Sequence, residues 1–266
     1  MAMEKWNLDG EVAIVTGGGT GLGKAICLAL AGAGADIALA ARRAEPIERV
    51  AAEIESMGRR ALAIPTDVAD SKQVEGMVAR TLSKFGKVDI LINNAGGSVR
   101  GVEEIKQIWE ITDQEWHQGI DMNLTGTFFC CRTVGKHMME RRKGRIINIS
   151  SAAGLRGMRN MPMYCSSKAG IIMLTMSLAM SWAEWGVRVN CLAPAWLATW
   201  RRPEEYEGFS RHMILGRVGL ASEIGPLAVY LASDASKYVT GQVFSIDGGV
   251  AAAGAAPVGS APTVDL

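Results

Sequence analysis

The chain of 266 residues carries 28 basic and 27 acidic side chains, and its net charge of +1 excludes the strongly basic surface typical of nucleic-acid and anionic-membrane binding. Hydrophobic residues make up 48% and charged residues 21%, as in ordinary globular proteins. This length is sufficient for a substantial core. We therefore expect a protein that binds small molecules, with no nucleic-acid or membrane partner.

The termini, cysteines and histidines point to a cytoplasmic protein. The first residues lack the basic and apolar regions of a signal peptide, and residues 169–183, the longest uncharged stretch, are too short for a membrane span. The five cysteines are odd in number and form no Cys-x-x-Cys, which is typical of reduced thiols. The three histidines have no metal-ligand spacing. We expect no metal site, and we interpret residues 169–183 as a buried helix of a core or a subunit interface.

Short apolar, β-branched runs alternate with helical patterns along the chain. The runs typical of buried strands are residues 11–16, 36–41, 61–65, 88–92, 144–151, 186–192 and 242–246. The helical patterns are residues 24–31, 46–57, 71–85, 112–141, 164–184 and 222–231. This alternation predicts an α/β fold in one domain, a parallel sheet with helices on both faces. Ligands of such sheets bind at the carboxyl ends of the strands.

A glycine-rich turn follows the first strand. Gly17, Gly21 and Gly23 have the spacing Gly-x-x-x-Gly-x-Gly, which differs from the common Gly-x-Gly-x-x-Gly. Between a strand and a helix, such a turn lets the backbone approach a pyrophosphate, whose charge meets unpaired N–H groups and the helix dipole. The turn therefore predicts nucleotide binding, although a glycine-rich segment by itself is often only a turn.

The end of the second strand bears on the choice between NADP and NAD. A carboxylate at this position binds the ribose 2′-hydroxyl of NAD, whereas an arginine accommodates the 2′-phosphate of NADP. Here the strand ends at Ala41 without an acid, and Arg42 and Arg43 follow. This favours NADP(H) over NAD(H). The alternative is that both arginines belong to a solvated loop.

Tyr164 and Lys168 form a candidate acid/base pair. Four residues apart in a predicted helix, they lie on one face, one turn apart. The ordinary pKa of a phenol, about 10, is too high for proton transfer near neutrality, and a nearby ammonium lowers it. Tyr-x-x-x-Lys also occurs by chance as an amphipathic surface pair, so the pattern alone leaves both interpretations open.

Polar residues also interrupt or follow other predicted elements. Asn123 and Gly126 both lower helix propensity within residues 112–141, which predicts either a local distortion that presents a polar group or a capped helix break. Ser150 and Ser151 end the fifth strand, at the same sheet edge as the glycine turn.

Two irregular segments follow. Residues 196–217 are predicted to form a substrate loop, of which the polar and aromatic part from residue 200 onward would lie like a lid over the site. Residues 251–266, rich in alanine, glycine and proline, are expected to be a flexible or partner-held tail.

Taken in this order, the motifs resemble those of the short-chain dehydrogenase/reductases over about residues 8–250. They are Thr16-Gly17-x-x-x-Gly21-x-Gly23, Asp67-Val68, Asn93-Asn94-Ala95-Gly96, Asn123, Ser151, Tyr164-x-x-x-Lys168 and Asp247-Gly248-Gly249. The family implies a Rossmann-type, doubly wound, seven-stranded parallel sheet, with residues 1–250 as an NAD(P)-binding catalytic domain. It also implies a homotetramer built on helices 112–141 and 164–184. Some stretches are similar to gluconate 5-dehydrogenases and to 3-oxoacyl-(acyl-carrier-protein) reductases.

The resemblance implies roles for individual residues. Tyr164 would be the acid/base, Ser151 would hydrogen-bond the substrate oxygen, and Lys168 would lower the tyrosine pKa and hold the nicotinamide ribose. Asn123 would anchor a water in a proton relay. Cofactor-binding residues would be Gly17, Thr20, Gly21, Leu22, Gly23, Arg42, Asp67, Val68, Asn94, Ala95, Gly96, Tyr164, Lys168, Pro194 and Thr199.

The chain departs from the family pattern at two positions. Ala195 replaces the usual glycine after Pro194, and Thr20 stands where NADP-preferring relatives often carry a basic residue. The NADP prediction therefore depends on Arg42 and on the missing acid at Ala41. Candidates to line the substrate cleft, with an apolar wall and arginines that bind a carboxylate or phosphate, are Arg100, Met158, Met161, Met163, Trp196, Trp200 and Arg201.

These patterns lead to one principal hypothesis and three alternatives. We expect an NADP(H)-dependent oxidoreductase that interconverts a secondary alcohol and a ketone. The alternatives are an NAD-dependent sugar-acid or polyol dehydrogenase, a non-catalytic nucleotide-sensing relative, and an epimerase or dehydratase that retains its nucleotide.

Overall fold

A seven-stranded parallel sheet forms the centre of the protein. The structure is a computed structural model, and it describes residues 3–98, 106–199, 210 and 213–252. The strands are β1 (Val12–Thr16), β2 (Asp36–Ala41), β3 (Ala61–Pro65), β4 (Ile90–Asn93), β5 (Gly144–Ile149), β6 (Val187–Pro194) and β9 (Val243–Ile246). Their order is β3-β2-β1-β4-β5-β6-β9, and all neighbours pair in parallel.

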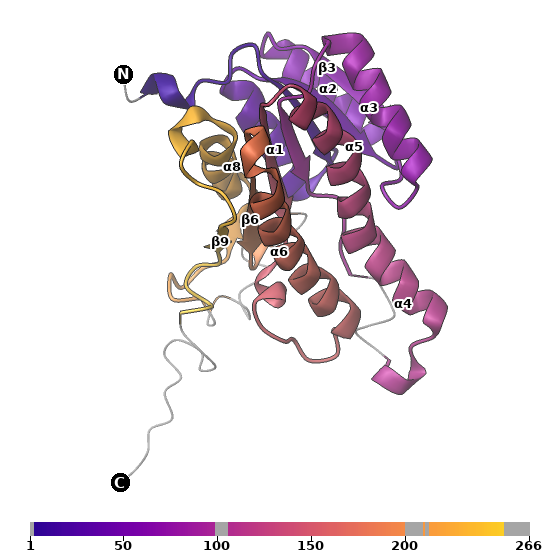
Figure 1. Cartoon of the computed structure of the whole chain (residues 1–266). Coiled ribbons are helices and arrows are strands. Elements are labelled where there is room, and N and C mark those ends of the chain that lie inside the picture. The colour runs from indigo at the N-terminus through magenta and orange to yellow at the C-terminus, as the bar shows by residue number, and fades with distance from the viewer. Residues whose placement is uncertain (1–2, 99–105, 200–209, 211–212, 253–266) are drawn as a thin grey trace.

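Helices cover both faces of this sheet (Figure 1). One face packs against α1 (Gly21–Gly32), α2 (Ala44–Ser56) and α8 (Gly225–Ala232). The other packs against α3 (Ser71–Phe85), α5 (Gly126–Glu140) and α6 (Pro162–Trp182). This arrangement confirms the predicted single-domain, doubly wound, Rossmann-type fold.

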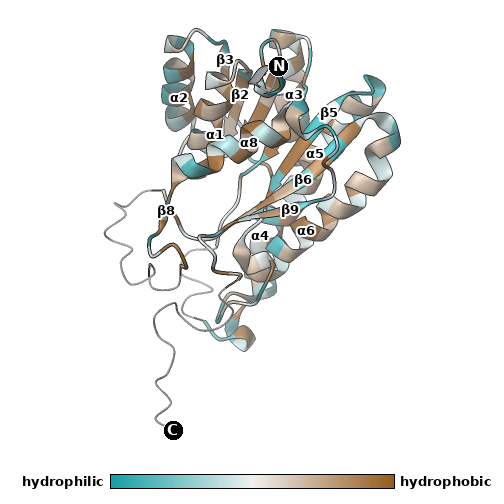
Figure 2. Cartoon of the chain, turned by 90° about the vertical axis from the view of Figure 1, so that its left-hand side faces the viewer, coloured by the Kyte–Doolittle hydropathy of each residue, from teal (hydrophilic) through white to brown (hydrophobic). Residues whose placement is uncertain are grey.

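The strands have side chains in two separate cores, one on each face. In β1, Ala13 and Val15 belong to the core under α1, whereas Val12 and Ile14 belong to the core under α3 and α5. Successive side chains of a strand point to opposite faces, so a strand buried on both sides must be apolar at every position. Figure 2 shows the strands mostly in the brown of hydrophobic residues, between helices of mixed hydropathy.

Some boundaries differ from those predicted because glycine and proline are tolerated in the first turn of a helix. Helix α2 begins at Ala44, two residues before Pro46, whose missing N–H has no helical partner at that position. Helix α8 likewise carries its proline in the first turn, and the 3-10 turn Ala221–Ile224 precedes it. Helix α1 begins at Gly21, so the glycine turn runs directly into the helix.

The predicted helix 112–141 has an interrupted hydrogen-bond pattern. It consists of α4 (Asp113–Ile120), the π-helical turn η3 (Asp121–Thr125) and α5. A π-helical turn shifts the backbone bonds to i→i+5 and is frequent at functional sites. Asn123 lies within this turn, and its Nδ2 donates to the carbonyl of Gly119 at 2.9 Å. The local distortion predicted from Asn123 and Gly126 is therefore present.

The strand order reverses between β1 and β4, and this position determines where a ligand can enter. The turn after β1 and the segment after β4 lie side by side at the carboxyl edge of the sheet. Such a switch point opens a crevice in doubly wound sheets. The glycine turn and residues 94–97 therefore form the two walls of one crevice.

Two short strands lie outside the main sheet. β7 (Leu197–Ala198) and β8 (Gly219–Leu220) pair in parallel and bring together the two ends of the segment between them. Most of the predicted lid lies outside the described residues, as does the tail from residue 253.

The helix α6 and its 3-10 extension, Pro162–Trp185, are long and apolar enough to cross a membrane by length and composition alone. The helix packs against β6, and Ser167, Lys168 and Thr175 are buried along its inner face. A core helix of a globular protein passes the same test, and these contacts are those of a core helix.

Candidate active site

The glycine turn after β1 is tied to the segment after β4 by a set of hydrogen bonds. Thr16 Oγ1 accepts from the N–H groups of Asn94 and Ala95, both at 3.0 Å. Asn94 Nδ2 donates in return to the carbonyls of Thr16 (3.0 Å) and Gly17 (3.3 Å). The Asn94 side chain therefore holds the two walls of the crevice together, which explains an amide at this position.

Two of the glycines are required by this close approach. A Cβ on Gly17, whose φ is +67°, would lie 2.7 Å from Asn94 Nδ2. A Cβ on Gly23 would collide with the Gly17 carbonyl and lie 2.6 Å from the same amide nitrogen. Neither position has room for a side chain. The turn consequently brings backbone without side chains up to the start of α1.

An outer cleft of about 380 Å³ begins at the turn and extends over the ends of β2 and β3. Predicted site residues among its lining are Gly17, Arg42, Asp67, Val68, Ala95 and Gly96; it is also lined by Ala41, Arg43, Thr66 and Met122. Arg42 is exposed at this rim, and Ala41 supplies no carboxylate. The Asp67 carboxylate accepts from the Ala69 N–H at 3.0 Å, which shapes the loop after β3.

An inner cleft of about 370 Å³ continues from the turn toward α6. The two clefts share Gly17, Ala95 and Gly96. Predicted site residues that line the inner cleft are Gly17, Thr20, Gly21, Leu22, Asn94, Ala95, Gly96, Ser151, Tyr164, Lys168, Pro194 and Thr199. The structure therefore brings these residues together, although they come from widely separated parts of the chain.

Lys168 lies at the base of the inner cleft. Its side chain is almost fully buried, and Nζ donates to the Ile149 carbonyl at 3.0 Å. Nζ also lies 5.6 Å from the centre of the Tyr164 ring. Burial lowers the pKa of the Lys168 ammonium from 10.5 to about 8, because a charge is poorly solvated there.

The two serines after β5 have different environments. Ser151 is half-buried and lines the inner cleft, where its Oγ accepts from the Ala153 N–H at 3.1 Å. Ser150 is buried, and its Oγ donates to the Lys168 carbonyl at 2.7 Å. Both serines line the inner cleft, but Ser151 is the more exposed of the two, whereas the hydroxyl of Ser150 is occupied by the Lys168 carbonyl.

Asn123 and Gly23 line neither cleft, unlike the other predicted site residues. Asn123 is buried, its Oδ1 accepts from the Gly97 N–H (3.0 Å), and its Nδ2 donates to the Gly97 carbonyl (2.9 Å). It therefore holds the rim of the inner cleft from behind. Gly97, which lines the inner cleft, was not among the predicted site residues; its position directly after the Asn-Asn-Ala-Gly motif was the available signal.

Ala195, which replaces the usual glycine, lines the inner cleft beside Pro194. Its N–H donates to the Ile246 carbonyl at 3.0 Å, and Pro194 is paired in register with Ile246. The backbone before and at Ala195 is therefore held by the neighbouring edge strand β9.

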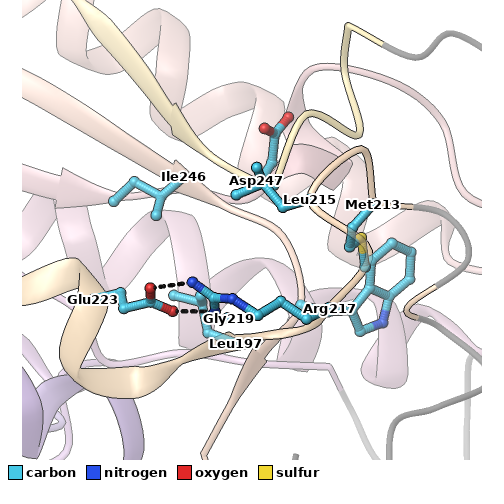
Figure 3. A pocket seen from close by; sticks show the side chains of 10 residues that line it. Leu197, Met213, Leu215, Arg217, Gly219, Glu223, Ile246 and Asp247 are labelled. Carbon is cyan, nitrogen blue, oxygen red and sulfur yellow. Dashed lines mark hydrogen bonds and ion pairs between the residues drawn. The ribbon is translucent and has the colours of Figure 1, made fainter. Parts of the chain in front are cut away.

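A third pocket, of about 250 Å³, lies between the ends of β6 and β9 and the segment before β8 (Figure 3). We call it the Arg217 pocket. Arg217 and Glu223 form two hydrogen bonds at its base, of 2.8 and 2.6 Å, which lower the pKa of Glu223 to about 2. Leu197 lines both this pocket and the inner cleft, so β7 separates the two spaces.

The proposed substrate-lining residues have mixed outcomes. Trp196 lines the Arg217 pocket, whereas Met163 is fully buried against Gly119 and belongs to the core. The expectations for Arg100, Trp200 and Arg201 lie outside the described residues. Across residues 3–98, 106–199 and 213–252, no group of three or more His, Cys, Asp or Glu side chains is arranged to hold a metal ion.

Two joined clefts at the switch point of a doubly wound sheet, with a glycine turn at their junction, define the class as a dinucleotide-dependent enzyme. Comparison with known proteins identifies the family. Residues 11–208 match the model of the short chain dehydrogenases.

Individual relatives agree with this match over nearly their whole length. The 3-oxoacyl-[acyl-carrier-protein] reductase of Synechocystis sp. is 37% identical over 91% of this chain and 98% of the relative. The 2-dehydro-3-deoxy-D-gluconate 5-dehydrogenase of Dickeya dadantii is 34% identical over 94% and 98%. The crystal structure of NADPH-dependent 3-quinuclidinone reductase from Rhodotorula rubra superimposes with a TM-score of 0.87 at 31% identity, covering 94% of each chain. The chain belongs to the short-chain dehydrogenase family and is an NAD(P)-dependent oxidoreductase.

Proposed function

We propose that this enzyme interconverts a secondary alcohol and a ketone with NADP(H), and that Tyr164 is its acid/base. The observation that carries the proposal is the junction of the two clefts at Gly17, Ala95 and Gly96. One cleft has Arg42 at its rim and the other has Tyr164 above a buried lysine. A dinucleotide with its pyrophosphate at the turn would place its two halves in the two clefts.

The residues of the outer cleft support a preference for the phosphorylated cofactor. A guanidinium is suited to a phosphate, and β2 ends without the carboxylate that would bind a free 2′-hydroxyl and repel a 2′-phosphate. One relative of similar structure is named as NADPH-dependent. We assign the 2′-phosphate to Arg42 and the adenine to Asp67 and Val68.

The inner cleft would hold the nicotinamide half. We assign the nicotinamide ribose to Tyr164 and Lys168, and the amide side of the ring to Pro194 and Thr199, which line the same cleft. The bound nicotinamide supplies or accepts the hydride. The protein itself has to orient the substrate oxygen and to move one proton.

Tyr164 is the group that moves this proton. In the reducing direction its phenol donates to the substrate oxygen, and in the oxidising direction the phenolate accepts from the alcohol. With a pKa of about 8, Lys168 is mostly protonated at pH 7, and its ammonium favours the phenolate. The Ser151 hydroxyl, at the same cleft, donates a hydrogen bond to the substrate oxygen.

The role of Asn123 as the anchor of a relay water stays a prediction. Both side-chain polar atoms of Asn123 are bound to the backbone of Gly97 and Gly119. We therefore assign this side chain the additional task of holding the cleft rim.

A ketone or alcohol substrate is supported by the names of the relatives, which include a 3-oxoacyl reductase, a gluconate-derived 5-dehydrogenase and a quinuclidinone reductase. Their substrates differ in size and charge. We infer that the reaction type is shared and that the segments flanking β7 select the substrate.

We also propose a cytoplasmic homotetramer. The outer faces of α5 and α6 expose Phe128, Met173 and Met180, with 42%, 63% and 85% of their surfaces accessible. Exposed apolar residues on adjacent long helices are suited to a subunit interface. Light scattering after gel filtration would give the mass: four times 28.4 kDa supports the tetramer, and 28.4 kDa contradicts it.

The test of the proposed reaction is cofactor oxidation across a panel of ketones, run with NADPH and NADH in parallel. The panel contains 5-ketogluconate, an acetoacetyl thioester, an aryl ketone and a cyclic diketone. Turnover of one class, faster with NADPH, supports the proposal. Binding of NADPH without turnover of any of them contradicts it and favours a nucleotide sensor.

A further inference from the structure

Lys168 is attached to the end of β5 at two points. Its Nζ donates to the Ile149 carbonyl at 3.0 Å, and its own carbonyl accepts from Ser150 Oγ at 2.7 Å. The two bonds run in opposite directions: one joins Lys168 to Ile149, the last residue of β5, and the other joins it to Ser150, the residue after the strand. Both the backbone and the ammonium of Lys168 are thereby held against the same strand end.

These bonds are shielded from water. Ser150 and Lys168 have only 3% and 4% of their surfaces exposed. The lone pairs of a helix carbonyl permit a second hydrogen bond besides the helical one, so Ser150 need not break α6. Because water cannot replace a lost bond at this depth, removal of the hydroxyl would leave the Lys168 carbonyl without its second partner.

The turn that follows Ser151 closes over this contact. A Cβ on Gly154 would lie 2.7 Å from both Ser150 Oγ and the Lys168 carbonyl carbon. Ser151 caps this turn, Ala152–Gly154, by accepting from the Ala153 N–H. The position of Ser150 therefore couples two parts of the inner cleft, the ammonium of Lys168 and the hydroxyl of Ser151.

We propose that Ser150 is a positioning residue for the acid/base pair, holding Lys168 at the depth where its ammonium acts on Tyr164. This inference rests on the proposed role of Tyr164. Ser150 is one of the residues at the wall of the inner cleft, but it is buried and its hydroxyl is bonded to the Lys168 carbonyl, so we assign its effect on the acid/base pair to Lys168. Among the described residues, the titratable groups that face Lys168 are Tyr164 on the same helix and Cys191 on β6. Burial raises the pKa of the Cys191 thiol to about 11, so it is mostly neutral up to pH 10; loss of its hydrogen bond with Ser150 would raise this pKa further.

The test compares Ser150→Ala with Ser236→Ala. Ser236 is also fully buried and donates to backbone carbonyls, those of Leu231 and Ser233, but it lies in the turn after α8. Both variants lose one hydroxyl from the interior and should lose similar stability. Only Ser150→Ala should affect the lysine.

The first readout is independent of activity. Lys168 is labelled with acetic anhydride at pH 8, and the modified fraction is measured by mass spectrometry of peptides. We expect labelling at least about 5-fold faster in Ser150→Ala than in wild type, and unchanged labelling in Ser236→Ala. Equal rates in all three proteins would overturn the proposal.

The second readout is the pH profile of kcat between pH 6 and 10. Comparison with Tyr164→Phe shows which part of this profile depends on the ionisation of the tyrosine. For Ser150→Ala we expect kcat at pH 7 to fall about 10-fold and KM to change less than about 3-fold. The part of the pH profile that depends on the tyrosine should move to higher pH. If Tyr164→Phe keeps the wild-type rate, the proposed function fails, while the labelling result still decides on Ser150. If Tyr164→Phe is inactive and Ser150→Ala keeps the wild-type profile, only the role of Ser150 fails.

A shape-matched variant covers the case in which Ser150→Ala does not fold. Ser150→Cys keeps a side chain of similar shape but is a weaker donor. We expect Ser150→Cys to change the labelling rate and the pH profile in the same direction as Ser150→Ala, but less. Wild-type behaviour in both readouts would overturn the proposal.

Discussion

Nζ of Lys168 lies 5.6 Å from the centre of the Tyr164 ring, and both residues line the inner cleft. The same ammonium is buried and has the carbonyl of Ile149 as a hydrogen-bond partner. The lysine is therefore close enough to act on the phenol, and burial strengthens that interaction because it removes screening water.

Replacement of Tyr164 by phenylalanine should remove the proton-transferring hydroxyl and keep the ring. We expect kcat to fall by roughly 10² to 10⁴, the usual contribution of general acid/base catalysis. The Kd for NADPH, measured by fluorescence titration, should stay within about 3-fold of the wild-type value. A variant that turns over at the wild-type rate would contradict the mechanism.

Replacement of Lys168 by methionine should stabilise the protein at neutral pH. The folded-state pKa of about 8 lies below the unfolded value of 10.5, so the buried charge costs roughly 3 kcal/mol at pH 7. Loss of the bond to Ile149 offsets about 1 kcal/mol of this, which leaves a gain of about 2 kcal/mol.

The sign of the pH dependence follows from the same pKa values. Above pH 10.5 the lysine is neutral in both states and its burial carries no charge penalty; the penalty grows as pH falls toward 8. Urea unfolding at pH 7 and pH 10.5 should therefore show the advantage of Lys168→Met shrinking at the higher pH. An advantage that is equal at both values, or absent at pH 7, would refute the predicted burial of the charged form.

Replacement of Arg42 by aspartate should move the cofactor preference toward NADH. The change removes the group assigned to the 2′-phosphate and places in the same cleft a carboxylate that repels a 2′-phosphate. We expect the ratio of kcat/KM for NADPH to that for NADH to fall at least about 10-fold, which corresponds to about 1.4 kcal/mol.

Arg80 on α3 provides the matched control for charge. It is exposed and lines neither cleft, and Arg80→Asp should leave the ratio unchanged. If wild type and Arg42→Asp have the same ratio of kcat/KM for NADPH to that for NADH, Arg42 does not bind the cofactor.

Replacement of Gly17 by alanine should weaken both folding and cofactor binding. A Cβ at φ +67° is strained, and it would lie 2.7 Å from Asn94 Nδ2. We expect the free energy of unfolding to fall by about 2 to 5 kcal/mol, from backbone strain and overpacking together. NADPH affinity should fall as well, because the turn and the Asn94 segment have to separate.

Gly76 on α3 is the control for this change. No atom lies within 4 Å of a Cβ placed there, so Gly76→Ala should raise stability by up to about 1 kcal/mol through helix propensity. Urea unfolding of the two variants gives both values. Wild-type stability in Gly17→Ala would show that the crevice tolerates a side chain.

Much of the fold was predictable because it depends on local sequence. The strand at residues 61–65 and the helix at residues 71–85 were predicted with the bounds observed. In the structure, Asp70 caps this helix by accepting from the N–H groups of Lys72 and Gln73. Boundaries at Pro46 and Gly21 were misplaced, because the first turn of a helix accepts residues that its interior rejects.

The sequence predicted more about some residues of the site than about others. Tyr164 and Lys168 were paired from their spacing alone, because a helix brings residues four apart onto one face. The family resemblance singled out Ser151, but the partner of Ser150 was not readable from two adjacent serines. It depends on the backbone direction after β5, which turns the Ser150 hydroxyl to the Lys168 carbonyl and the Ser151 hydroxyl to the Ala153 N–H.

The sequence by itself determined the alternation of strands and helices, the glycine turn, and the spacing of the tyrosine and lysine. These features arise from side-chain periodicity and backbone sterics over a few residues. Only the tertiary structure decided that the two clefts meet at Gly17, that Lys168 is buried with a lowered pKa, and that Asn123 holds Gly97. Each of these depends on contacts between segments far apart in the chain, which no local pattern encodes.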